Sequence, residues 1–525
     1  MALFANLPED IVFIIATSLA RKDLSALSRT CKPIREHVIP YLYHSLVWSF
    51  GSQPSFLDLP CFSPWCDPSG HKRTQAPLHL LLRTLVATRS LGALVNTFTV
   101  AGPIRFRCAQ CSVRNYDYAL RERNLYPASL WPPDEEGRHI GSEEMLVFEK
   151  LAEELEASMG IEGTLALRQA VRSGNPTAYT ILIISMLPNL RTLRLGFDYH
   201  SRMDGLGHLF RHMLFNHSTE SGSCVSTIHR VALSTSRHHE QLRHESALGL
   251  DMDTFTNLLY LPDIKEIEAS LPPVPALGLQ WPSPHGQPPI ALSLTSLRLW
   301  QCEGDVKTLK NILQATPNLR HLTYGHIWYK NGVIHPLDLC DFLHALTYVS
   351  GTLQELYIRS RTRKHGWKVD SSVWYELGHA PKGRIESLEE FVHLRKLCIP
   401  WVFLVGFEVK SPAEVTFRLP LSIESVCFTD DPDKFADWEW DDGRACAEHI
   451  HQLLQNKAKK TPRLKRIHYL IKFALWSCYP SGDIIIQEAT EELERAGVHA
   501  DVEVEVEHKI GSVTMNAPHH CDTWA

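Results

Sequence analysis

The sequence of 525 residues predicts an α/β protein with a short helical module at its N-terminus and a long repeat region behind it. Apolar residues recur at helical spacing through the first 45 residues, with polar breaks between the segments. A six-residue motif with apolar positions 1, 4 and 6 then occurs nine times, and helix-like stretches separate its copies. These observations predict helices first, followed by strands that alternate with helices.

The front module is expected to contain three short helices. Pro8 suits the first turn of a helix, because its missing N–H would have no partner there. Polar residues 21–23 then break the apolar pattern, and Asp23 is expected to cap the second helix. Thr30 is expected to cap the third helix in the same way. Pro33 fits the first turn of that third helix.

The order of residues in this module resembles the F-box motif, and its ending Pro40-Tyr41-Leu42-Tyr43 resembles fungal variants of that motif. The match begins Leu7-Pro8-x-Asp10-Ile11 and continues through Asp23-Leu24-x-x-Leu27 to Thr30-Cys31-Lys32. The resemblance implies that the module docks on the Skp-family adaptor of a cullin–RING ubiquitin ligase. It assigns that contact to these residues: Leu7, Pro8, Ile11, Ile14, Leu19, Leu24 and Leu27. The alternative is a helical cap that packs only on its own chain.

The nine copies of the repeated motif lie between residues 190 and 469, and several follow Pro-Asn or Pro-Asp. They begin at Leu190, Ile228, Ile264, Leu294, Leu319, Leu353, Leu394, Ile423 and Leu464. Positions 4 and 6 of a strand point to the same face, so each copy predicts a strand with one buried face. A single unit cannot bury that face alone, and the units must therefore stack.

This pattern resembles the leucine-rich repeat in its irregular form, because successive copies start 25 to 41 residues apart. The resemblance implies a curved solenoid with strands on the concave side and helices on the convex side. An ordinary α/β domain with unrelated strands is the alternative. The expected organisation is an F-box at 1–50, a transition at 51–89, the repeat region with insertions at 90–510 and a flexible tail at 511–525. Residues 503–507 alternate Glu and Val and predict a half-exposed strand at the last edge.

A target-binding surface follows from the same register, since positions 3, 5 and 7 face away from positions 4 and 6. Arg, Trp and Tyr often anchor interfaces. Residues of these types at such positions are Arg194, Arg230, Arg298, Trp300, Tyr357 and Arg359. Over the nine copies these positions hold six Arg or Lys and three Glu, although the whole chain carries a net charge of −6. This excess predicts a face that binds an acidic or phosphorylated protein segment.

Motifs for other chemistry are sparse. Cys108-x-x-Cys111 has zinc-like spacing, but no second such pair completes four ligands, so we expect no metal and no cofactor. No phosphate-binding loop and no nucleophile elbow is found, which argues against an enzyme. The charge favours neither nucleic acid nor membrane surfaces. No apolar run approaches the roughly 20 residues that span a bilayer. A protein of the cytoplasm or nucleus, with free thiols, is expected.

These observations favour a substrate-recognition subunit of a Skp–cullin–F-box ubiquitin ligase. In this role the front module binds the adaptor and the repeat region holds a target protein. An interaction scaffold that binds the Skp adaptor without promoting ubiquitination is the alternative. An enzyme whose site assembles from scattered residues is the third possibility.

Overall fold

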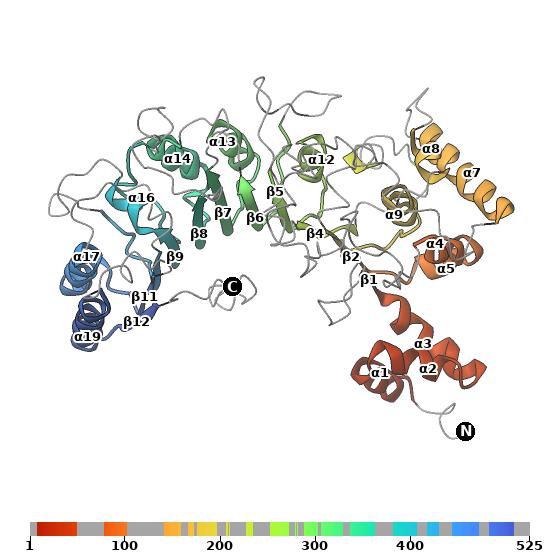
Figure 1. Ribbon diagram of the computed structural model, residues 1–525, viewed down its shortest axis with the longest axis horizontal. Helices are drawn as coiled ribbons and strands as arrows, with labels where there is room; N and C mark the ends of the chain where they lie inside the picture. The colour runs from red at the N-terminus through yellow and green to blue at the C-terminus, as the bar shows by residue number, and fades with distance from the viewer. Residues whose placement is uncertain are drawn as a thin grey trace, which may run out of the picture. The chain divides into compact units, whose positions relative to one another are not determined.

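A computed structural model describes most of the secondary structure of the chain (Figure 1). The described residues are 8–49, 78–101, 141–158, 166–172, 176–196, 206–207, 209–210, 227–234, 252–271, 279, 281, 288–302, 306–328, 337–362, 382–406, 417–429, 444–471 and 482–508. The chain divides into two compact units, one formed by Met1–His239 with Asp253–Ile264 and the other by Glu240–Met252 with Lys265–Ala525.

The first unit starts with three helices, as the sequence predicts, and continues with strands and further helices. Its elements are α1 (Glu9–Ser18), α2 (Arg21–Ser28), α3 (Lys32–His44), β1 (Ser45–Ser49), α4 (Leu78–Ala87), α5 (Arg89–Gly92), β2 (Thr97–Ala101), α7 (Ser142–Ser158), α8 (Ala166–Arg172), α9 (Pro176–Ser185), β3 (Thr192–Gly196), β4 (Arg230–Ser234) and, apart from its first residue, α12 (Met252–Leu258). Helix α4 lies within the stretch expected to be a transition, and β1 follows α3 directly and pairs with β2.

The second unit alternates strands with helices. Its elements are β5 (Glu266–Ser270), β6 (Ser296–Cys302), α13 (Val306–Gln314), β7 (His321–Trp328), α14 (Leu339–Leu346), the 3₁₀ turn η5 (Thr347–Val349), β8 (Glu355–Thr362), β9 (Lys396–Pro400), α16 (Trp401–Val405), β10 (Ser425–Thr429), α17 (Arg444–Gln455), α18 (Lys457–Lys460), β11 (Arg466–Ile471), α19 (Gly482–Ala500) and β12 (Glu503–His508). Helices α13, α14, α17 and α19 lie on one side of the strands of this unit (Figure 1).

The described strands form one parallel sheet of twelve, ordered as in the chain. All nine copies of the motif are strands, β3 to β11, and the alternating Glu-Val segment is β12. This confirms the predicted fold class, an α/β protein with N-terminal helices and a leucine-rich-repeat-like sheet. The residues at position 1 of the nine copies are all at most 1% exposed. They form a buried row that stacks each repeat on the next.

Polar side chains in the turns before the strands join neighbouring repeats. The Asn189 amide donates to the carbonyl of Ala93 at 2.7 Å, and the Asn318 amide donates to that of Leu292 at 2.8 Å. The Thr352 hydroxyl donates to the Leu319 carbonyl at 2.9 Å. These bonds satisfy turn carbonyls that no strand ladder reaches, which explains why Pro-Asn precedes several copies of the motif.

Two expected helix caps are wrong. Helix α2 begins earlier than predicted, with Ala20 as its cap, so Asp23 lies in the first turn of the helix. There its carboxylate still interacts favourably with the helix dipole. Helix α3 has Cys31 as its cap, and the Thr30 hydroxyl instead donates back to the carbonyl of Leu27 at 2.8 Å. Pro33 lies in the first turn of α3, as predicted.

Candidate functional site

The three front helices enclose a small core of their own. Ala16, Leu24, Ile34 and Val38 are buried in it, and partly buried side chains pack around them. Four buried residues make a small core, and segments of this size bury little of their surface. Apolar side chains left outside this core are therefore available to another surface.

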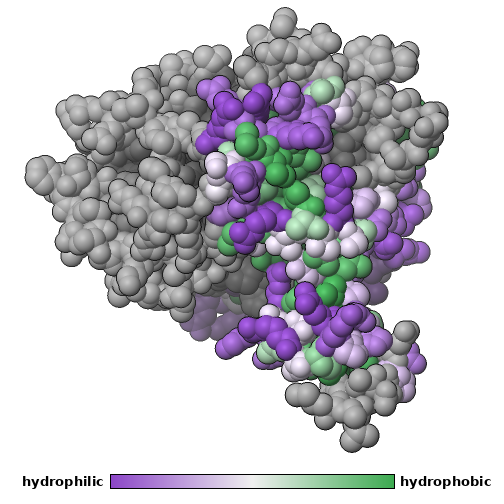
Figure 2. Space-filling view, turned by 90° about the vertical axis from the view of Figure 1, so that its right-hand side faces the viewer, coloured by the Kyte–Doolittle hydropathy of each residue, from purple (hydrophilic) through white to green (hydrophobic). Residues whose placement is uncertain are grey.

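Helix α1 turns three large apolar side chains outward. The exposed fractions are 42% for Ile11, 52% for Phe13 and 58% for Ile14, while Val12 and Ala16 face the inside of the module. At about 100° per residue, Ile11 and Ile14 lie about 60° apart and form an apolar arc on one side of the helix, whereas Phe13 lies about 160° from Ile11. The Phe13 ring packs instead on Tyr41 of α3, with 5.9 Å between ring centres. Figure 2 shows hydrophobic residues at the surface among hydrophilic ones on the side of the molecule that it views. A contiguous apolar arc on a polar surface is typical of a protein-binding site.

The remaining residues predicted to contact the adaptor lie in different places. Pro8 is exposed at the start of α1. Leu19 and Leu27 are partly buried against the core of the module, and Leu24 is inside it. Leu7 lies outside the described residues. Phe13, which is not among the predicted residues, is 52% exposed and packs on Tyr41 of α3.

The strand face opposite the core carries the residues predicted to hold a target. Arg194 is exposed on β3 and Arg230 is half-buried on β4, both in the first unit. Arg298, Trp300 and Arg359 are half-buried on β6 and β8 in the second unit. Two of them, Trp300 and Arg359, stand at position 7 of their strands and contact each other.

Trp300 lies between an acidic and a basic side chain. Its indole N–H donates to Oε1 of Glu268 at 3.0 Å, and the Arg359 guanidinium carbon lies 5.4 Å from the centre of its ring. These residues come from β5, β6 and β8. Strand β7 lies between β6 and β8, and its residue beside Arg359 is Gly325. A bulge places residues 300 and 301 opposite Gly325, because Leu299 pairs with Tyr324 and Cys302 with His326. Without a side chain at 325, Arg359 reaches across β7 to the indole ring.

Glu355 contacts a histidine and a lysine at the start of β8. Its carboxylate lies 3.1 Å from His321 Nδ1 on β7 and 2.9 Å from Lys396 Nζ on β9. Burial opposes the charge of Glu355, but the hydrogen bonds and charges of His321 and Lys396 outweigh it and lower its pKa to about 2. Lys396 is therefore already paired and is not a free anchor for an anion.

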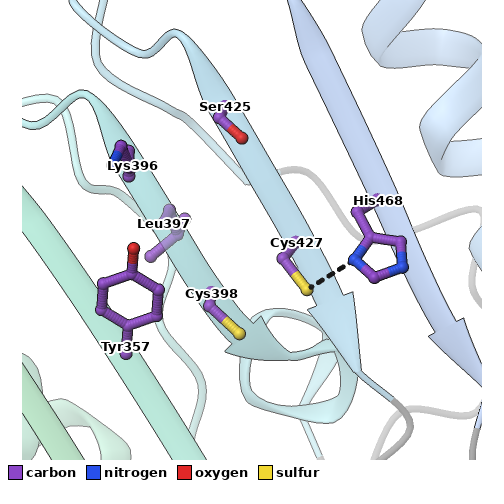
Figure 3. Close-up of a pocket in the computed structure, with 7 residues that line it drawn as sticks. All are labelled: Tyr357, Lys396, Leu397, Cys398, Ser425, Cys427 and His468. Atoms are coloured by element: carbon purple, nitrogen blue, oxygen red, sulfur yellow. Dashed lines mark hydrogen bonds between the residues drawn. The ribbon is translucent and has the colours of Figure 1, made fainter. Parts of the chain in front are cut away.

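A shallow hollow of about 20 Å³, partly open to solvent, lies on the same face further along the sheet (Figure 3). It is lined by Tyr357, Lys396, Leu397, Cys398, Ser425, Cys427 and His468. Tyr357, one of the predicted target-binding residues, belongs to this hollow and is 9% exposed. The Cys427 thiol lies 3.7 Å from Nδ1 of His468.

The predicted excess of positive charge does not extend over this whole face. In the second unit, positions 3, 5 and 7 of strands β5 to β11 carry four Lys or Arg and three Glu. The last strand, β12, adds Glu503, Glu505 and Glu507, so the strands together carry six Glu. Arg466 is paired with Glu503 at 2.6 Å. The basic residues nearest Trp300 are Arg298 on its own strand, β6, and Arg359 on β8.

Other predictions concern metals and membranes. Cys108 and Cys111 lie outside the described residues. Within the described ranges, no cluster of three or more His, Cys, Asp or Glu side chains is arranged to hold a metal ion. None of the helices in the described part of the chain is long and apolar enough to cross a membrane.

Comparison with known proteins does not assign the chain to a family. No protein-family model matches it, and a search of curated proteins finds no similar sequence. The features that bear on function are the geometry of these surfaces and the resemblance of residues 7–48 to the F-box motif.

Proposed function

We propose that this chain is a substrate-recognition subunit of a Skp–cullin–F-box ubiquitin ligase, with α1–α3 as the F-box that binds the Skp-family adaptor. The observation that carries the proposal is the outward apolar arc of α1, formed by Ile11 and Ile14. The core of the module holds four buried residues and leaves this arc exposed. Covering the arc with a partner would remove its apolar surface from water, which favours binding.

The proposed target-binding surface is the patch around Trp300 on β5–β8, made of Glu268, Arg298, Trp300 and Arg359. A partly buried indole with a guanidinium on its face offers a large contact area and a bidentate anion donor. This combination suits a protein segment with an aromatic or apolar anchor beside an acidic or phosphorylated residue. Arg194 and Arg230 on β3 and β4 offer the same chemistry in the first unit.

In this role the chain needs no catalytic residues. It acts as a scaffold, because holding a target near a charged conjugating enzyme raises the effective concentration of target lysines. The alternative proposal is an adaptor-binding scaffold that does not promote ubiquitination. Both proposals place the chain in the cytoplasm or nucleus, where such ligases work.

Adaptor capture tests the first half of the proposal. Purified wild-type chain should retain a Skp-family adaptor, and the double variant Ile11→Asp/Ile14→Asp should lose it, because two charges then replace apolar surface on the arc. His37→Asp, at an exposed position of α3, is the matched control and should retain the adaptor. Equal retention by the double variant would show that α1 is not the contact.

Ubiquitination separates the two proposals once adaptor binding is established. Proteins that co-purify with wild type should be ubiquitinated in the presence of the cullin–RING ligase, and the variant Trp300→Ala/Arg359→Glu should lose both the co-purifying protein and its modification. Arg320→Glu, an exposed change at the edge of β7, is the control. Adaptor binding without any ubiquitinated partner would favour the scaffold.

A further inference from the structure

The turns that precede β9, β10 and β11 share one geometry. In each turn a backbone N–H donates to the carbonyl three residues earlier, and the donor–acceptor pairs are Leu394–Phe391, Ile423–Pro420 and Leu464–Thr461. The first residue inside each turn is Val392, Leu421 or Pro462. The strands that follow pair in register, so these three residues occupy equivalent positions in neighbouring repeats. Neighbouring strands lie about 4.8 Å apart, and the three turns therefore form one short row.

Apolar side chains on this row face solvent. Val392 is 60% exposed and Leu421 is 63% exposed, and Pro462 is exposed as well. In the following repeat, Val498 in the last turn of α19 is 80% exposed. Single exposed apolar residues are ordinary on a protein surface, but apolar residues that are exposed in consecutive repeats are typical of a binding surface.

Basic side chains surround the row. They are Arg395, Lys457, Lys459, Lys460, Arg463 and Lys465, and all except Lys457 are exposed. Together with Val392, Leu421 and Pro462, these residues form what we call the turn patch. The acids on the same turns are Glu390, Glu424 and Asp501. Six cations against three acids make the turn patch positive, although the whole chain carries a net charge of −6.

Some cations of the turn patch already have an acidic partner. Glu424 lies 4.0 Å from Nε of Arg395 and 3.5 Å from Nζ of Lys465. Among the ion pairs of the described residues, none includes Lys459, Lys460 or Arg463. These three exposed cations are therefore available to an anion from outside the chain.

The segment that carries them is held in place by the fold. Thr461 and Leu464 are fully buried, and the N–H of Lys465 donates to the carbonyl of Glu424 at 2.8 Å. The ammonium of Lys457 donates to the carbonyl of Ala500 at 2.7 Å. A run of Lys and Arg in an extended segment is typical of a nuclear-import signal. Here the run is folded into a turn, so its side chains act as a fixed surface and not as an extended peptide.

The simpler interpretation is that these lysines only stabilise a helix end. Lys457, Lys459 and Lys460 belong to α18, and cations near a helix C-terminus interact favourably with the helix dipole. Arg463 lies beyond that helix, however, and the dipole gives no reason for the exposure of Leu421. A surface that combines exposed cations with exposed aliphatic side chains calls for a ligand that offers both negative charge and apolar surface.

We propose that the turn patch binds the surface of an anionic membrane. The lysines and arginines contact acidic phospholipid headgroups, and the exposed aliphatic side chains enter the boundary between headgroups and acyl chains. Acidic phospholipids are concentrated in the cytoplasmic leaflet. The proposal concerns a surface that the ligase role does not use, and it stands or falls independently of that role.

The shape of the turn patch favours a membrane over an acidic protein segment. Anchors at protein interfaces usually enter a pocket on the partner or receive one from it. The turn patch instead presents its own apolar side chains outward from turns at one end of the strands, and a deformable bilayer interface accepts such side chains without a preformed pocket. Nucleic acid is disfavoured because the turn patch contains no aromatic side chain on which a base could stack.

The experiment mixes the purified full chain with vesicles of phosphatidylcholine that contain about 30% phosphatidylserine and separates bound from free protein by sedimentation. Wild type should bind these vesicles more tightly than pure phosphatidylcholine vesicles, and added salt should weaken the binding. The variant Lys459→Gln/Arg463→Gln should bind about 25-fold more weakly, because each cation near the surface contributes about fivefold. Lys150→Gln/Lys307→Gln removes two exposed charges elsewhere and should bind like wild type.

Leu421→Ser tests the apolar half of the proposal. It should weaken binding to the same vesicles by about tenfold and leave the salt dependence unchanged, because it removes apolar surface and no charge. Leu146→Ser on α7, where the side chain is 62% exposed, is the matched control and should bind like wild type. All these changes are at exposed positions, and thermal denaturation should show that each variant is folded.

Three results would overturn the proposal. The first is equal binding of wild type to vesicles with and without phosphatidylserine. The second is equal affinity of Lys459→Gln/Arg463→Gln and its control, or of Leu421→Ser and its control. The third is binding of wild type to a poly-glutamate peptide or a DNA duplex but not to the vesicles, which would assign the turn patch to that partner instead.

Discussion

His326 on β7 makes the stability of the second unit depend on pH in a window that can be tested. Its ring is 2% exposed, stacks on Tyr324 at 6.2 Å between ring centres and lies 3.4 Å from the Tyr324 hydroxyl. Its register partners are Cys302 and Ser360, and neither carries a charge near neutral pH. Burial away from water lowers the pKa of His326 from its ordinary value of 6.5 to about 3.

The sign and the size of the effect follow from proton linkage. The unfolded chain binds a proton at this histidine below pH 6.5, whereas the folded chain does not bind it until about pH 3. Stability is therefore fully present above pH 6.5 and is lost as the pH falls, by about 1.4 kcal/mol for each pH unit. Between pH 7 and pH 5 the loss from this one residue is about 2 kcal/mol, a large part of a typical folding free energy.

The assay is urea denaturation followed by circular dichroism at pH 7 and pH 5. Glu355 does not interfere, because its contribution is lost only at lower pH. His326→Gln should reduce the difference in unfolding free energy between the two pH values by about 2 kcal/mol. The exposed control His344→Gln should leave that difference unchanged. An unchanged difference in His326→Gln would refute the reasoning, whatever the variant does to stability at pH 7.

Three further changes test the packing described above. Leu24→Ala removes a side chain that is 7% exposed in the core of the front module, and it should destabilise α1–α3 by about 2–4 kcal/mol, measured by thermal denaturation. Glu355→Gln should lower the free energy of unfolding by about 1–2 kcal/mol at pH 7, after allowance for solvent screening. Measured against pH, this difference should vanish as the pH falls from 4.5 to about 2, where the wild-type carboxylate also becomes neutral. Gly497→Ala places a Cβ 2.5 Å from Val504 Cγ2 and 2.7 Å from the Val502 carbonyl oxygen. This clash should outweigh the gain of about 1 kcal/mol in helix propensity, so β12 should become more sensitive to proteolysis.

The sequence predicts the strands of this fold well, because the requirement for buried residues at positions 1, 4 and 6 is local. All nine motif copies are strands. Strand β1 was missed, since Ser45–Ser49 follows α3 without the turn that precedes the other strands. The caps of α2 and α3 were misplaced by a few residues, because several polar residues in each break can take the capping position.

The sites were less predictable, because they depend on contacts between strands. Sequence register placed Trp300 and Arg359 on one face, but their contact needs the bulge at residues 300–301 and the missing side chain of Gly325. The hollow lined by Tyr357, Cys398, Cys427 and His468 similarly requires the pairing of β8 to β11. In the front module, the pattern identified apolar positions without showing that Leu24 turns inward and Ile14 outward.

Titration of a purified Skp-family adaptor into the full chain tests the central claim most directly. Ile14 is 58% exposed, so covering it should contribute about 1–2 kcal/mol, and placing an unpaired carboxylate there should cost more. We therefore expect calorimetric binding by wild type with a negative heat-capacity change, and an affinity at least about 100-fold weaker for Ile14→Asp. His37→Asp should bind like wild type. Absence of binding by wild type, or equal affinities for Ile14→Asp and His37→Asp, would contradict the assignment of α1–α3 as an adaptor-binding module.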